Sequence, residues 1–212
     1  MGNPRKDAFA ETSKTIIKNL EKRGMDGYFC ESSADAVKLV KELVPVGASI
    51  GWGGTETFRE TGVKDALEEG DYEMLDRSRV QGAEALREMY LSHLGCDVFF
   101  MSTNALTTKG ELVNIDGNSN RLACLLYGPK QVIVLVGMNK IVHSIEDGIN
   151  RIQTLACPPN ATRLHCDTPC ANVGVCGNCH NDDCMCCNIV VTRHNRHKGR
   201  VKVILIAEDL GF

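Results

Sequence analysis

The stretch Gln131-Val132-Ile133-Val134-Leu135-Val136 decides the fold class of this chain. This stretch is a short, mostly apolar run of the kind that a parallel sheet buries on both faces, and a second such run is Asp97-Val98-Phe99-Phe100-Met101. Further segments with strand character lie at residues 27–31, 48–52, 72–75, 188–192 and 201–207. Helical patterns separate most of these strands, and this alternation predicts an α/β domain with a mostly parallel sheet flanked by helices.

Helices are expected where apolar residues recur at a spacing of three to four. Such patterns cover residues 9–20, 36–43, 81–94, 120–127 and 144–155, the last of which begins with a Ser144-x-x-Asp147 capping pattern. The pattern stops at Pro158-Pro159, and no hydrophobic period follows for about thirty residues. We therefore expect a single α/β domain over residues 1–212 that carries a cysteine-rich insertion at residues 157–187.

The charge balance and the apolar runs argue against two classes of partner. Lys and Arg number 24 against 27 Asp and Glu, so the net charge of −3 provides no basic surface for nucleic acid. The apolar runs, such as Val132 to Val136, are far shorter than the roughly 20 residues that cross a bilayer. Because residues 1–6 lack the features of a secretory signal, we expect a cytoplasmic protein. The sequence is compatible with a homo-oligomer but specifies no subunit number.

A glycine-rich turn, Gly51-Trp52-Gly53-Gly54-Thr55, follows one predicted strand and precedes a predicted helix. Backbone amides at such a turn bind phosphate or carboxylate groups, and glycines let the ligand approach them closely. The three glycines and Thr55 are therefore candidate substrate-binding residues. The alternative is a tight turn whose glycines supply only unusual dihedral angles. The dinucleotide-binding fingerprint is incomplete, which argues against NAD.

A polar run, residues 102–123, follows the predicted strand that ends at Met101. In open α/β sheets, ligands bind in the crevice outside the carboxyl ends of the strands. The side chains of this run that could bind a small anionic substrate there are Thr103, Asn104, Asn114, Asn120 and Arg121. Its two carboxylates, Glu111 and Asp116, are the candidate catalytic residues. The alternative is that each of these residues only forms a turn or caps a helix.

Eight of the eleven cysteines follow the pattern Cys157-x8-Cys166-x3-Cys170-x5-Cys176-x2-Cys179-x4-Cys184-x-Cys186-Cys187. A reducing cytoplasm disfavours disulfides, and a Cys-x2-Cys pair brings two thiolates to one metal, so the pattern predicts a metal site. The spacing matches neither the ferredoxin pattern nor a zinc ribbon, and it leaves an iron–sulfur cluster and structural zinc open. Two alternatives use Cys176-Gly177-Asn178-Cys179-His180: a redox disulfide, or c-type haem attachment, which requires export.

Several motifs resemble, in the same order, those of the LUD domain family, which is named for lactate utilisation. They are Gly51–Thr55, Ser102-Thr103-Asn104-Ala105, Gly110–Gly117 with Asn120-Arg121-Leu122-Ala123, Gly128-Pro129-Lys130, and Val136-Gly137-Met138-Asn139-Lys140-Ile141-Val142. The resemblance covers nearly the whole chain and ends at Glu208-Asp209-Leu210-Gly211-Phe212. It implies a fold like that of ribose-5-phosphate isomerase and the coenzyme A transferases. It also implies a role in oxidising lactate to pyruvate, alongside iron–sulfur oxidoreductase subunits.

The same resemblance implies which cysteines bind the metal. The clostridial-type branch of the family carries a similar insertion, to which Thr168-Pro169-Cys170, Gly174-x-Cys176 and Cys179 are similar, with a last cysteine just before the next strand. The implied ligands are Cys170, Cys176, Cys179 and Cys187, with Cys186 as an alternative fourth ligand and Cys166 as a spare. The association with lactate oxidation favours an iron–sulfur cluster over zinc.

Three functions are compatible with these features. The first is a LUD-type protein that takes part in the oxidation of lactate or a related 2-hydroxy acid, with an iron–sulfur cluster in the insertion. The second is a transferase or isomerase that acts on a small anionic or acyl substrate and holds a structural zinc. The resemblance to coenzyme A transferases would make Glu111 its nucleophile. The third is a regulator without catalysis that senses metal or redox state.

Overall fold

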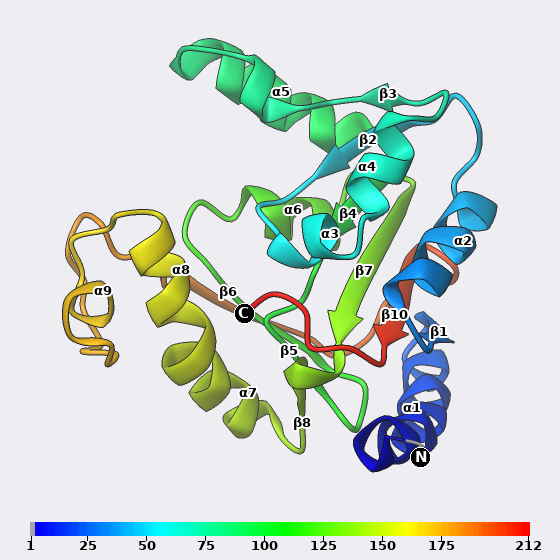
Figure 1. Ribbon diagram of the computed structural model, residues 1–212. Helices are drawn as coiled ribbons and strands as arrows, with labels where there is room; N and C mark the ends of the chain where they lie inside the picture. Colours follow the sequence, from blue (N-terminus) through cyan, green and yellow to red (C-terminus); the bar gives the residue numbers. More distant parts are fainter. Residues whose placement is uncertain (1–2) are drawn as a thin grey trace.

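The computed structural model describes residues 3–212, and its centre is a six-stranded parallel sheet (Figure 1). The strand order is β1-β10-β7-β4-β2-β3, and every neighbouring pair is parallel. The strands are β1 (Asp26–Cys30), β2 (Ser49–Trp52), β3 (Glu73–Met74), β4 (Val98–Met101), β7 (Gln131–Gly137) and β10 (Val201–Ile206). The two runs that decided the fold class, β4 and β7, are neighbours at the centre of the sheet, which confirms the α/β prediction.

Helices cover both faces of this sheet because side chains alternate between the faces along each strand. The helices are α1 (Pro4–Lys22), α2 (Ser33–Leu43), α3 (Glu56–Glu60), α4 (Val63–Glu68), α5 (Ala83–Gly95) and α6 (Asn120–Leu126). Val98 and Phe100 of β4 pack with α2, α3 and α4 on one face. Phe99 and Met101 pack with α1 and α6 on the other face. β4 is therefore buried on both sides, as its apolar run predicts.

A second sheet of four short strands, in the order β8-β5-β6-β9, lies beside the first. Its strands are β5 (Ala105–Thr107), β6 (Leu112–Asp116), β8 (Ile141–Val142) and β9 (Asn188–Thr192). β5 and β6 form an antiparallel hairpin within the polar run that the sequence analysis treated as a loop system. The expected strand at residues 188–192 is present, but it pairs with β6 in this second sheet.

A helical path runs from α7 (Ile145–Arg151) through a π-helical turn (Ile152–Ala156) into α8 (Cys157–Arg163). The expected capping box of Ser144 and Asp147 begins it. The expectation that the helical pattern stops at Pro158-Pro159 is wrong, because both prolines lie in the first turn of α8. Proline nitrogens carry no hydrogen to donate, and the π-turn directly before them changes the hydrogen-bond register of the helix.

The remainder of the cysteine-rich insertion has little regular structure. Its one further helix among the described residues is α9 (Pro169–Val173), which packs against α8 (Figure 1). No helix within residues 3–212 is both long enough and apolar enough to cross a membrane.

Candidate functional site

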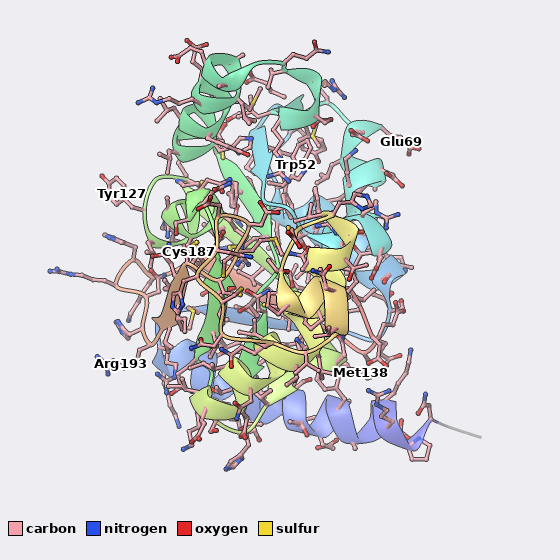
Figure 2. The ribbon with its side chains drawn as sticks, turned by 90° about the vertical axis from the view of Figure 1, so that its left-hand side faces the viewer. Trp52, Glu69, Tyr127, Met138, Cys187 and Arg193 are labelled. Atoms are coloured by element: carbon pink, nitrogen blue, oxygen red, sulfur yellow. The ribbon has the colours of Figure 1, made fainter. Side chains whose placement is uncertain are left out.

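A crevice of about 550 Å³ opens at the carboxyl ends of four neighbouring strands, β10, β7, β4 and β2. The segments that follow these strands contribute Gly54 and Thr55, Ser102 to Asn104, Lys140, and Gly211 with Phe212. The opposite wall comes from the end of β6 and from the cysteine segment, a name we use for residues 157–187. Figure 2 views the molecule from the side of this segment, with Cys187 near the middle of the picture.

The glycines at the end of β2 and in the turn after it are closely approached by other side chains. None of Gly51, Gly53 and Gly54 has a positive φ, so their dihedral angles do not demand glycine. A Cβ on Gly53 would lie 2.9 Å from Cγ and Cδ of Arg121, and one on Gly54 would lie 2.9 Å from Nη2 of Arg77. A Cβ on Gly51 would lie 2.8 Å from the ring of His93. Of the three glycines, only Gly54 lines the crevice.

Thr55 carries an unsatisfied polar atom at the crevice. Its Oγ1 is buried and has no hydrogen-bond partner within residues 3–212, and Thr55 lines the crevice. Although Thr55 is the N-cap residue of α3, its side chain does not cap the helix. A buried hydroxyl without a partner costs free energy unless a ligand or water satisfies it. This atom is therefore a polar group that a ligand or a water molecule in the crevice can satisfy.

Lys140 is a crevice residue that the sequence analysis did not select. Its side chain is only 4% exposed, and Nζ donates to Thr57 Oγ1 at 2.9 Å and to Ser102 Oγ at 3.0 Å. No carboxylate of the described chain forms an ion pair with Lys140 or with Arg77, which also lines the crevice. The crevice thus contains two cations that form no ion pair in the described chain and can bind an anion, while the carboxylates of Glu56, Asp116, Asp182 and Asp183 also line it.

The pKa of Lys140 is lowered to about 7. Burial is the main cause, because the charged amine loses its hydration, and the positive charges of Arg151 and Arg121 lower the pKa further. The carboxylate of Glu60 acts in the opposite direction. Near neutral pH, Lys140 therefore changes between an ammonium that binds anions and an amine that can accept a proton.

Arg121 organises the wall of the crevice with all of its N–H groups. Nε donates to Asp116 Oδ2 at 3.1 Å, and the two terminal nitrogens donate to carbonyl and amide oxygens of the surrounding backbone and side chains. These acceptors are the carbonyls of Ser102 and Ile115 and the side-chain oxygens of Asn104 and Asn114. Because a guanidinium has five N–H donors, no donor remains for a ligand in this conformation. Arg121 and its partner Asp116 therefore hold the wall of the crevice in place through hydrogen bonds within the chain.

Most of the other side chains expected to bind substrate line the crevice, whereas Asn114 does not. Thr103, Asn104 and Asn120 line the crevice, as do Asp116 and Arg121. The hydroxyl of Thr103 donates to the carbonyls of Ala105 and Val113, at 2.9 and 3.2 Å. Asn114 does not line the crevice, but its Nδ2 is a second buried donor without a partner in the described chain.

The structure places Glu111 away from the crevice, at the distant end of the β5–β6 hairpin. Its carboxylate forms an ion pair with Arg23 of the chain segment after α1 and accepts a hydrogen bond from the hydroxyl of Thr107. The hairpin returns to the crevice only at Ile115 and Asp116, the last two residues of β6. The two carboxylates expected to share a site therefore lie at opposite ends of one strand, and Glu111 stabilises the hairpin.

Two cysteines from the ends of the cysteine segment meet at its base. Sγ of Cys157 and Sγ of Cys186 lie 3.4 Å apart. The hydrogen bond with Cys186 lowers the pKa of Cys157, while burial and the charges of Cys170, Cys176 and Cys184 oppose this shift. The thiols of Cys170, Cys176, Cys184 and Cys186 therefore lie close enough to Cys157 to shift its pKa, although they are distant from it in sequence.

The four cysteines implied as metal ligands are only partly brought together. Burial, the neighbouring Cys184 and, to a smaller extent, the charge of Cys170 raise the pKa of Cys179. The charges of Cys170 and Cys176 also act on Cys157, so the first three ligands share a neighbourhood with Cys157. Cys187 is exposed, and its Sγ donates to the carbonyl of Cys184 at 3.3 Å. Within residues 3–212, no three His, Cys, Asp or Glu side chains converge closely enough to hold a metal ion. The donor chemistry fits a thiophilic metal, whereas the arrangement of the thiols is not that of a closed site.

The comparisons with known proteins agree with the fold. A family model described as "LUD domain" matches residues 13–206. A crystal structure of a DUF162 family protein from Deinococcus radiodurans is similar, with a TM-score of 0.53 and 13% sequence identity over 93% of this chain and 97% of that chain. At this identity the similarity concerns the fold alone. No curated protein matches the chain.

Proposed function

The chain belongs to the LUD domain family, and from this premise we propose that it takes part in the oxidation of lactate or a related 2-hydroxy acid. The substrate carboxylate would bind in the crevice at the strand ends. The observation that carries the proposal is the unsatisfied Oγ1 of Thr55 in a crevice that also contains the unpaired cation of Lys140. A carboxylate can accept hydrogen bonds from both groups, and a lactate molecule is far smaller than the 550 Å³ crevice.

The crevice also contains a group that can move a proton. Oxidation of a 2-hydroxy acid to a 2-oxo acid removes two electrons and two protons, one of them from the hydroxyl group. Lys140, with a pKa of about 7, is half deprotonated near neutral pH and can accept that proton. Ser102, whose hydroxyl lies 3.0 Å from Nζ of Lys140, also lines the crevice and can orient the substrate.

The cysteine segment adjoins this substrate position. An iron–sulfur cluster held by Cys170, Cys176, Cys179 and Cys187 would supply electron transfer at the crevice, which Cys187 lines. Separate iron–sulfur subunits would then be the electron-transfer partners. Because metal binding and folding of such a segment are coupled, we expect its thiols to converge when the metal binds.

Ligand titrations test the anion site. Lactate and pyruvate should bind the protein, and Lys140→Met should weaken both at least about tenfold because it removes a cation beside the carboxylate. Lys130→Met is the matched control, since Lys130 is an exposed lysine paired with Asp97, and it should leave both affinities unchanged. Failure of every carboxylate to bind, or equal affinities for the Lys140→Met variant and the native protein, would contradict the proposal.

The pH dependence of binding is a second test of the same site. Protonated Lys140 attracts the carboxylate, so the affinity should fall about tenfold between pH 6 and pH 8 as Lys140 loses its proton. The Lys140→Met variant should show no such decrease. A native affinity that rises with pH would exclude Lys140 as the carboxylate partner.

A second function, a transferase or isomerase with structural zinc, is favoured by one distance. Two thiolates on a single zinc ion lie about 3.8 Å apart, given Zn–S bonds of about 2.3 Å in a tetrahedron. The 3.4 Å between Cys157 and Cys186 is close to that value, whereas the thiolates of a 4Fe–4S cluster bind different iron atoms and lie farther apart. Protein purified without oxygen should be brown and contain iron if the first function holds. Colourless protein with stoichiometric zinc, and tighter binding of sugar phosphates than of lactate, would favour the second.

A further inference from the structure

Cys157 and Cys186 are not among the four proposed cluster ligands, yet their thiols are in hydrogen-bond contact, at 3.4 Å between sulfur atoms. We propose that they are a redox-active dithiol, which forms a reversible disulfide at the wall of the crevice by exchange with small disulfides of the glutathione class. This inference does not depend on the proposed oxidation of 2-hydroxy acids, because it concerns different residues and a different reactant.

The placement of both residues favours disulfide formation. Cys157 is the first residue of α8, and Cys186 lies two positions before β9, so regular elements flank the pair. Both side chains pack against the small core formed by Ala105, Val113 and Ile152 beneath the second sheet. A disulfide requires a sulfur separation of about 2.05 Å, so the two sulfur atoms need to approach by only about 1.4 Å. Rotation of one side chain can supply this movement.

The crevice assigns the roles of the two thiols, because both are partly buried and only Cys157 lines it. Cys157 lines the crevice, so a small disulfide can reach its sulfur from there. Cys186 is partly buried and does not line the crevice, although it lies against Cys157. By contrast, Cys30, Cys96 and Cys124 are buried in the main domain and inaccessible to such a reagent.

The exchange takes place in two steps. The thiolate of Cys157 attacks one sulfur of the small disulfide, which forms a mixed disulfide and releases one small thiolate. The thiolate of Cys186 then attacks the sulfur of Cys157 in this mixed disulfide, which forms the Cys157–Cys186 bond and releases the second small thiolate. The protein loses two electrons to the small disulfide, and the two protons of the dithiol pass to the released thiolates. An excess of the small thiol reverses both steps.

The disulfide would join the two ends of the cysteine segment. It would connect α8 covalently to the chain just before β9 and so close a loop over the residues between them. Because that loop forms one wall of the crevice, the redox state of the pair would fix the position of the wall.

Peptide mapping tests the proposal on the full chain, because trypsin separates the two thiols. Cleavage after Arg151, Arg163 and Arg193 gives one peptide, residues 152–163, with Cys157 as its only cysteine, and a second peptide, residues 164–193, with the other cysteines of the segment. After incubation with glutathione disulfide, alkylation and digestion without reduction, mass spectrometry should find these two peptides cross-linked. The cross-link should disappear on treatment with reduced glutathione. The metal content of the same sample is measured before and after oxidation.

Variants identify the partner of Cys157. Cys186→Ser should abolish the cross-link, whereas the matched controls Cys187→Ser and Cys166→Ser should retain it. Three results would overturn the proposal. In the first, Cys157 stays reduced. In the second, the cross-link persists in Cys186→Ser. In the third, Cys157 and Cys186 resist both oxidation and alkylation until a chelator removes a metal, which would make them metal ligands.

Discussion

Replacement of Lys140 by Met should stabilise the protein at pH 6, although Lys140 makes two hydrogen bonds. Lys140 is 4% exposed and forms no ion pair in the described chain, so no adjacent opposite charge compensates the burial of its ammonium group. Its two partners keep other acceptors after the change. The hydroxyl of Thr57 also donates to the carbonyl of Leu210 at 3.3 Å, and that of Ser102 donates to the carbonyl of Thr103 at 3.2 Å.

The size of the effect follows from the pKa of Lys140, which falls from 10.5 to about 7 in the folded protein. At about 1.4 kcal/mol per unit, the protonated form is disfavoured in the folded state by about 5 kcal/mol. The unfolded chain keeps the proton up to pH 10.5, so the free energy of unfolding rises as the pH increases from about 7 toward 10.5. Between pH 6 and pH 9 this single group should add about 3 kcal/mol to the stability of the native protein.

Urea unfolding at pH 6 and pH 9, in the presence of a reductant, measures this difference. Lys140→Met should be more stable than the native protein at pH 6, by up to about 5 kcal/mol, and this advantage should shrink by about 3 kcal/mol at pH 9. Lys130→Met is the control, because Lys130 has a raised pKa through its bond to Asp97 and stays protonated at both pH values. The reasoning is refuted if Lys140→Met is the less stable protein at pH 6, or if its advantage does not change with pH.

Three further substitutions, and a control for the first of them, have outcomes that the structure predicts. Gly53→Ala should lower the free energy of unfolding by about 1–3 kcal/mol, because its Cβ would contact Arg121 at 2.9 Å. Gly95→Ala, whose Cβ meets nothing within 4 Å, should show no loss in the same urea titration. Glu111→Gln should destabilise the hairpin yet leave lactate affinity unchanged in calorimetry, and a weaker affinity would bring Glu111 back into the site. Cys176→Ser should reduce the metal content measured by elemental analysis, and full metal content would show that Cys176 is not a ligand.

The central sheet could be predicted from the sequence because β4 and β7 are apolar along their length and buried on both faces. The β5–β6 hairpin could not, because polar residues interrupt its strands. Thr107 and Asn114 are fully buried in these strands. The hydroxyl of Thr107 donates to Glu111, and the side-chain oxygen of Asn114 accepts from Arg121. Hydrophobic periodicity does not detect a strand whose buried positions are polar.

A crevice lies at the strand ends, where the sequence predicted a ligand site, and only some of its lining residues were among those predicted. Thr55 and Asn104 lie in the crevice as the order of strands and loops suggests. Lys140 was missed because lysine is almost always exposed, and only the folded chain shows that it lies beneath the crevice. The distance of Glu111 from the crevice depends on the hairpin, so it could not be foreseen without the second sheet.

The π-helical turn at Ile152–Ala156 sets the rotational phase of α8. Each α-helical residue advances about 100° around the axis, and a π-turn contains one residue more than the α-helical turn it replaces. Removal of one residue from this turn would therefore rotate α8 by more than a quarter of a revolution and carry the sulfur of Cys157 away from Cys186. Relatives that lack the extra residue should present a different face of the helix to the crevice, even where every cysteine is retained.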